Sequence, residues 1–177
     1  MTERTSGSLP GPDQNNRQKI LVIGIGNEYR GDDRMGLVIA REIREKHDPS
    51  VMVTEESGDG AALMEAWQGY EMVVLVDAVS SGAKPGTIVK IDARKEIVPA
   101  RFFQYSTHAF GIAEAIELAR TMNMLPPNIM IYGIEGASFN AGTEISEGVK
   151  ESGKQVVEQI VHDMNISVHE DGHGQFF

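Results

Sequence analysis

Short apolar runs rich in β-branched residues alternate along this chain with longer segments whose apolar residues recur at helical spacing. Runs that are apolar throughout are typical of parallel strands buried on both faces. Strands that alternate with helices form right-handed crossovers, so the sequence predicts an α/β fold, a three-layer α/β/α sandwich with a mostly parallel sheet. The expected strands are Ile20–Ile25, Val51–Thr54, Met72–Val76, Thr87–Asp92 and Asn128–Ile134, and the expected helices are Met35–Lys46, Ala61–Trp67, Phe110–Met122 and Glu147–Met164.

The expected strand Thr87–Asp92 differs from the others. It follows Met72–Val76 after a link too short for a crossover helix, so we expect it to be an antiparallel edge strand. No internal repeat or linker interrupts the core, and 177 residues suit a single domain. We therefore expect one α/β domain over residues 19–164, between a disordered N-terminal tail at 1–18 and a flexible C-terminal tail at 165–177.

Composition excludes several classes of function. The chain has 26 acidic residues against 16 Lys and Arg, a net charge of −10, which disfavours nucleic acid as a partner. It contains no Cys, which excludes disulfides, thiol nucleophiles and Cys-ligated metal sites. No apolar stretch is long enough for a signal peptide or a membrane helix. We expect a cytoplasmic protein with no membrane partner, and its polar helix faces favour a monomer.

Acidic side chains and one histidine follow the predicted strands where a ligand would bind. In open α/β sheets, ligands bind beyond the carboxyl ends of the strands, where the winding reverses. Asp32 and Asp33 lie in the loop after the first strand, Asp77 ends the third, and His108 precedes a helix. If the first and third strands are neighbours, these carboxylates share one crevice. Gly58-Asp59-Gly60 and Gly133-Ile134-Glu135-Gly136 either shape the same crevice or are only turns.

The loop from Gly24 to Asp33 is rich in glycine and stands between a strand and a helix, as a dinucleotide-binding loop does. That fingerprint requires Gly at its sixth position, where this chain has Tyr29. Two acids also stand where the phosphate would lie. A nucleotide-binding α/β protein is therefore disfavoured, and Gly24 and Gly26 at least allow a tight turn.

Each candidate residue also has a purely structural interpretation. Acids such as Asp33 suit a helix N-terminus, Asp77 can cap the turn after its strand, and His108 can be satisfied by the backbone. Together, two carboxylates and an imidazole suit Zn, Ni or a similar divalent ion with positions left open. The chain has no Gly-x-Ser-x-Gly elbow, and His169-Glu170-Asp171-Gly172-His173 matches the zinc-protease motif H-E-x-x-H only by chance, since it contains Gly and lacks an apolar stripe.

Three separated motifs resemble those of the hydrogenase maturation endopeptidases. They are Gly24-x-Gly26-Asn27-x-x-x-x-Asp32-Asp33-x-x-Gly36, Val76-Asp77-Ala78 and His108-x-x-Gly111, in the family's order and spacing. The resemblance covers nearly the whole core. It implies a twisted sheet of about five strands in a phosphorylase/hydrolase-like sandwich. The first acid is often Glu in the family, and here Asp33 stands in its place.

The resemblance also implies a function and a site. The family removes a C-terminal extension from the precursor of a NiFe-hydrogenase large subunit after nickel insertion, as a metal-dependent or aspartic-type protease. Its site residues map to Asp33, Asp77 and His108, both as catalytic and as metal-binding residues. The implied metal is nickel supplied by the substrate, for which zinc or cadmium can substitute. The rival interpretation is a non-catalytic α/β module that binds a metal or a partner.

Overall fold

The computed structural model describes residues 19–46, 48–103 and 109–165. Its sheet has five strands in the order β2-β1-β3-β5-β4. β1 pairs in parallel with β2 and β3, β3 pairs in parallel with β5, and β4 runs antiparallel to β5 at the edge. The mostly parallel sheet with an antiparallel edge strand is therefore confirmed. The strands are β1 (Ile20–Ile25), β2 (Val51–Glu56), β3 (Met72–Val79), β4 (Ile88–Asp92) and β5 (Asn128–Glu135).

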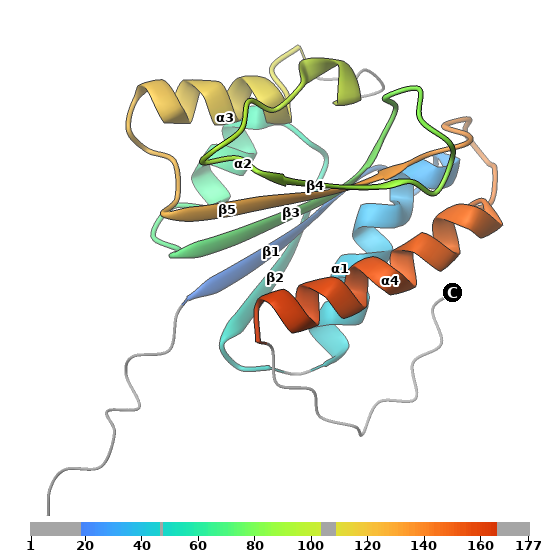
Figure 1. Cartoon of the computed structure of the whole chain (residues 1–177), viewed down its shortest axis with the longest axis horizontal. Coiled ribbons are helices and arrows are strands. Elements are labelled where there is room, and N and C mark those ends of the chain that lie inside the picture. The colour runs from blue at the N-terminus through green and yellow to red at the C-terminus, as the bar shows by residue number, and fades with distance from the viewer. Residues whose placement is uncertain (1–18, 47, 104–108, 166–177) are drawn as a thin grey trace, which may run out of the picture.

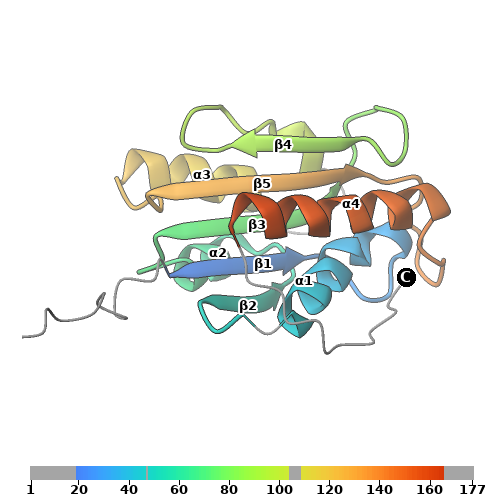
Figure 2. The same ribbon diagram turned by 60° about the horizontal axis from the view of Figure 1, so that its bottom comes forward.

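Helices cover both faces of the sheet, which confirms the three-layer sandwich (Figures 1 and 2). α1 and α4 pack together on one face, and α2 and α3 pack together on the other. Two short 3-10 helices, η1 before α1 and η2 before α3, complete the described elements. The bounds are η1 (Gly31–Arg34), α1 (Met35–Glu45), α2 (Gly60–Ala66), η2 (Ala100–Phe103), α3 (Ile112–Thr121) and α4 (Glu147–Asp163).

Alternate residues of the central strands pack into two separate cores. In β1, Ile20 and Val22 pack under α1 and α4, whereas Leu21 and Ile23 pack under α2 and α3. Because successive side chains of a strand point to opposite faces, both sets must be apolar. This double burial explains why the strands appear in the sequence as continuous apolar runs.

The order of the strands fixes where a ligand can bind. β1 leads through α1 to β2 on one side, whereas β3 is followed in the sheet by β5 on the other side. The winding therefore reverses between β1 and β3, and a crevice opens beyond their carboxyl ends. The first and third strands are neighbours, as the shared crevice requires.

The expectation that Asp77 is the last residue of its strand is wrong. β3 continues to Val79 because β5 runs beside it over this stretch, with Asp77 opposite Gly133 and Val79 opposite Glu135. Residues 1–18, His47, His108 and residues 166–177, with the H-E-x-x-H match, lie outside the described residues. Over the part of the chain that is described, no helix combines the length and apolar character needed to span a bilayer.

Candidate functional site

A pocket of about 60 Å³ lies at the carboxyl ends of the central strands. Residues from the loop after β1, the turn after β2 and the end of β3 meet there with residues from η2 and α3. One part of its wall is polar and the rest is apolar or main chain. The polar lining residues are Asn27, Arg30, Asp33, Ser57 and Asp77, and the others are Ile25, Gly26, Gly58, Ala78, Phe102, Phe103, Ile112 and Phe139.

Asp77 is a buried carboxyl in an otherwise apolar row. Val73 and Leu75 of β3 face the layer formed by α2 and α3, and Asp77 continues the same face of the strand. It is only 7% exposed. Burial raises the pKa of Asp77 well above its usual value, the negative charge of Asp33 raises it further, and a hydrogen bond from the backbone of Ala78 lowers it. A carboxyl held this way is costly to ionise unless a cation approaches.

Asp33 reaches the same pocket from η1. Its side chain is 15% exposed, and a terminal nitrogen of Arg30 lies 4.0 Å from its Oδ2. Burial raises the pKa of Asp33, and the positive charge of Arg30 lowers it in part. Asp33 is less buried than Asp77 and has a nearby cation, so it is the first of the pair to ionise.

The neighbouring Asp32 does not line the pocket, so the expectation that both acids share the crevice is wrong for this residue. Asp32 is fully buried. Its carboxylate accepts hydrogen bonds from the main-chain N–H groups of Ala137 at 2.7 Å, Ser138 at 2.9 Å and Ser146 at 2.6 Å, and from the Ser146 hydroxyl at 3.0 Å. Asp32 therefore fastens η1 to the segment before α4.

That segment, residues 136–146, is a part of the site that the sequence did not reveal. Phe139 lines the pocket, and its carbonyl accepts a hydrogen bond from Nε of Arg30 at 3.2 Å. Arg30 also forms a β-bridge with Ala141, and the N–H of Gly142 donates to the carbonyl of Tyr29 at 2.9 Å. These contacts join segments more than a hundred residues apart, so no local sequence signal could have predicted them.

Two glycines of the first motif allow close packing around Asp33. A Cβ on Gly36 would collide with the carbonyl oxygens of Ile25 and Val76, so this glycine lets α1 lie directly against β1 and β3. A Cβ on Gly26 would collide with the carbonyl of Asp33. These two glycines therefore let α1 and the loop after β1 pack closely around Asp33.

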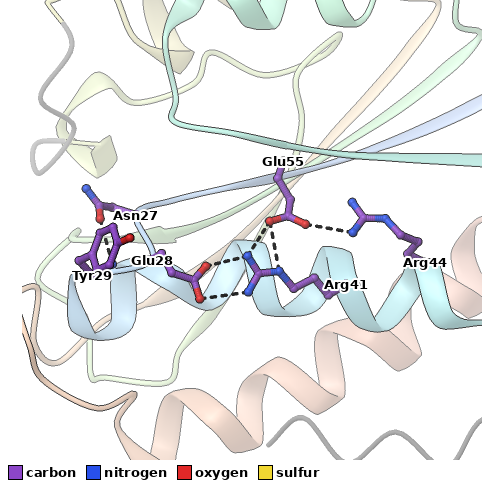
Figure 3. A network of polar contacts seen from close by, with 6 residues as sticks. All are labelled: Asn27, Glu28, Tyr29, Arg41, Arg44 and Glu55. Atoms are coloured by element: carbon purple, nitrogen blue, oxygen red, sulfur yellow. Dashed lines mark hydrogen bonds and ion pairs between the residues drawn. The ribbon is translucent and has the colours of Figure 1, made fainter.

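An ion-pair network ties the loop after β1 to α1 and β2, as Figure 3 shows. Arg41 pairs with both carboxylate oxygens of Glu28, at 3.1 and 2.6 Å, and with Glu55 at 2.7 Å. Arg44 contacts the other oxygen of Glu55 at 3.0 Å. Hydrogen bonds from Arg41 are the main reason that the pKa values of Glu28 and Glu55 are lowered. The side chains are partly exposed, so each ion pair contributes about 1 kcal/mol or less to stability.

Two further glycine-containing segments, 58–60 and 133–136, were expected either to shape the crevice or to be turns. Gly58 lines the pocket, whereas Asp59 caps α2 by accepting a hydrogen bond from the N–H of Ala62 at 3.0 Å. Glu135 is buried and accepts hydrogen bonds from the N–H and hydroxyl of Ser81 and from the N–H of Gly82, at 2.7–3.0 Å. The segment 133–136 therefore fastens the loop between β3 and β4.

The third predicted site residue, His108, lies outside the described residues. Phe103 and Ile112, which stand on either side of it in the chain, both line the pocket. Among residues 19–46, 48–103 and 109–165, no group of three His, Asp or Glu side chains is placed to hold a metal ion. The described part of the site is thus a pair of carboxyls, Asp33 and Asp77. Such oxygen donors suit a divalent cation that brings other ligands with it.

Comparison with known proteins gives a consistent result. The sequence model of the HycI hydrogenase maturation protease family matches residues 35–163. The hydrogenase expression/formation protein HupD of Rhodobacter capsulatus is 28% identical over 122 residues, which are 67% of this chain and 57% of that protein. The hydrogenase 2 maturation protease of Escherichia coli is 24% identical over 147 residues, which are 81% of this chain and 88% of that protein.

The fold is also shared with solved structures. The crystal structure of the NiFe hydrogenase maturation protease HycI from Thermococcus kodakarensis has a TM-score of 0.64 and 26% identity, and the match covers 85% of this chain and 95% of that one. The chain spans little more than half the length of HupD but most of the other two proteins. Because the family's sequence model matches well over half of its residues, this chain belongs to the hydrogenase maturation protease family.

Proposed function

We propose that this chain is a cytoplasmic, monomeric endopeptidase that removes the C-terminal extension from the precursor of a NiFe-hydrogenase large subunit after nickel has been inserted. Family membership supports the class of substrate and reaction. The observation that carries the proposal is that Asp33 and Asp77, which come from separate segments, line one pocket at the point where the winding of the sheet reverses.

Nickel carried by the precursor is the feature that the site recognises. Asp33, Asp77 and His108 are the proposed ligands, and zinc or cadmium can take the place of nickel. The buried carboxyl of Asp77 supports this assignment, because an approaching cation offsets the cost of ionising it. His108 is supported by its neighbours in the chain, since Phe103 and Ile112 both reach the pocket.

The chemistry follows from holding the substrate's metal at the two carboxylates. Asp33 and Asp77, with His108, would hold the ion against the scissile peptide, and the ion would supply Lewis-acid activation of water. Hydrolysis adds the water oxygen to the peptide carbonyl carbon, breaks the C–N bond and leaves a proton on the departing amine. The pocket of about 60 Å³ has room for only a few water-sized groups, so the peptide lies across its mouth.

The experiment is an incubation of the purified protein with nickel-loaded and with nickel-free precursor, followed by mass measurement of the precursor. We expect shortening of the nickel-loaded form only. Equal cleavage of both forms would contradict recognition through nickel. Binding without any shortening would indicate the non-catalytic module instead.

Substitutions test the site in the same assay. Asp33→Ala, Asp77→Ala and His108→Ala are expected to stop cleavage while the circular dichroism spectrum is kept. Asp92→Ala is the matched control, because Asp92 ends β4 at the opposite end of the sheet and pairs with Lys95. Cleavage at the normal rate by all three site variants would exclude the site.

A further inference from the structure

We propose that Arg30 weakens the binding of free divalent cations at the pocket of Asp33 and Asp77, so that nickel is captured only when the precursor delivers it. Arg30 thereby acts on the selectivity of the site and not on the bond that is cut. The inference rests on the proposed function, because it assumes that the two carboxylates receive the nickel of the precursor.

Arg30 lines the same pocket as the two carboxyls. Among the residues that line the pocket in the described parts of the chain, Arg30 is the one cation, beside the two acids Asp33 and Asp77. Its terminal nitrogen lies 4.0 Å from Oδ2 of Asp33, which is beyond hydrogen-bond distance, so this contact is mainly electrostatic. A guanidinium stays protonated at any physiological pH, so its charge is always present.

The arginine is also held in place from both its main chain and its side chain. Its N–H donates to the carbonyl of Asn27 at 3.1 Å, and its backbone forms the bridge to Ala141. Its Nε donates to the carbonyl of Phe139 at 3.2 Å, and its side chain is only 25% exposed. An exposed, loosely held Arg would swing into solvent when a metal ion arrived, whereas this one keeps its charge beside the ion.

The physical consequence is a penalty that applies to any cation at the site. A divalent ion at Asp33 lies close to a fixed positive charge in a partly buried pocket, where charges are weakly screened. A free ion must overcome this repulsion with the ligands of the pocket alone. When the precursor carries the ion, the contacts between the two proteins also contribute binding free energy. This contribution compensates for the repulsion between Arg30 and the ion. The site therefore discriminates delivered nickel from free nickel.

The test is a calorimetric titration of the protein with free Ni²⁺. Arg30→Gln removes the charge and keeps a donor for the Phe139 carbonyl, whereas Arg30→Lys keeps the charge. Arg34→Gln is the matched control, since Arg34 lies one turn further on, pairs with Glu144 at 2.8 Å and does not line this pocket. We expect Arg30→Gln to bind Ni²⁺ at least about tenfold more tightly than the wild type. Arg30→Lys and Arg34→Gln are expected to bind it as the wild type does.

Two further measurements locate and separate the effect. Adding Asp33→Asn to Arg30→Gln is expected to remove the gain in affinity, which would place the ion at the pocket. An equal Kd for Ni²⁺ in folded wild type and folded Arg30→Gln would overturn the inference, as would a submicromolar Kd in the wild type. Cleavage of the nickel-loaded precursor by the wild type is measured in a separate assay. Its absence would exclude the proposed function, whereas cleavage without the affinity change would exclude only the role of Arg30.

Discussion

Two adjacent aspartates, Asp32 and Asp33, lie in different surroundings, since Asp32 is buried among hydrogen-bond donors and Asp33 lines the pocket. Asp32→Ala leaves the buried N–H groups of Ala137, Ser138 and Ser146 without their acceptor. We therefore expect the free energy of unfolding to fall by about 3 kcal/mol. Asp33→Ala removes a partly exposed carboxyl that lies 4.0 Å from a terminal nitrogen of Arg30, so stability should stay within about 1 kcal/mol of the wild type while cleavage is lost.

Urea unfolding of the two variants, run beside the cleavage assay, checks this contrast. The assignment of Asp32 to structure and Asp33 to function would be wrong if Asp33→Ala unfolded more easily than Asp32→Ala.

The buried carboxyl of Asp77 makes the stability of the fold depend on pH. Its pKa is raised in the folded state, so the folded protein holds a proton that the unfolded chain releases above the usual carboxyl pKa of 3.8. Stability therefore falls as the pH rises above about 4. Asp77→Asn cannot ionise, so we expect it to be inactive and yet more stable than the wild type at pH 7, by on the order of 1 kcal/mol or roughly 3 °C in Tm.

Thermal unfolding at pH 7 and at pH 3 tests this sign. The gain should nearly disappear at the lower pH, where the wild-type carboxyl is mostly protonated in the unfolded chain as well as in the folded protein. A variant less stable than the wild type at pH 7 would mean that the ionised carboxylate is held by favourable contacts.

Some residues of the candidate site could be predicted from the sequence, and others could not. The place of Asp77 at the crevice was predictable, because an acid directly after an apolar run needs a partner. The residues alone did not separate Asp32 from Asp33, because their difference depends on segment 136–146, and only the family resemblance selected Asp33. Arg30 and Phe139 were missed, since their contact joins residues 109 positions apart and leaves no local pattern.

At the scale of elements, the packing of α1 against the sheet depends on a glycine. Gly36→Ala places a Cβ against the carbonyls of Ile25 and Val76, so α1 must move outward. We expect a loss of about 2 kcal/mol in the free energy of unfolding and a drop in cleavage, because η1 with Asp33 moves with the helix.

A second helical glycine provides the control for this substitution. A Cβ on Gly148 of α4 meets only the carbonyl of Pro85, at 3.9 Å. Gly148→Ala should therefore be neutral or stabilising by up to about 1 kcal/mol, as Ala is in most helices. Denaturant unfolding measures both variants, and equal effects of the two would contradict the role assigned to Gly36.

Most strands and helices were predictable from the sequence. The strands of a parallel sheet are buried on both faces, so each strand is a continuous apolar run. Strands β2 and β3 run further than expected: β2 continues to Glu56, and β3 passes Asp77, which was expected to end it. In the structure, pairing with β5 carries β3 through Asp77 to Val79. Pairing with a strand distant in sequence therefore decided where the element ends.

At the scale of the whole molecule, the order of the strands creates the site. Placing β1 beside β3, with β2 and β5 on opposite flanks, brings the loop after β1, the turn after β2 and the end of β3 to one crevice. The alternation of strands and helices predicts such a crevice, but it does not say which loops wall it. Asp32, Arg30 and the carbonyl of Tyr29 hold segment 136–146 at the site.

The central claim is that one ion is shared by side chains distant in the sequence. The most direct measurement is the anomalous difference map of a crystal grown or soaked in millimolar cadmium, a concentration that fills even a weak site. The account predicts a peak between the carboxylates of Asp33 and Asp77, with the imidazole of His108 as a further ligand. Ordered cadmium only elsewhere on the molecule, with both carboxylates left uncoordinated, would contradict it.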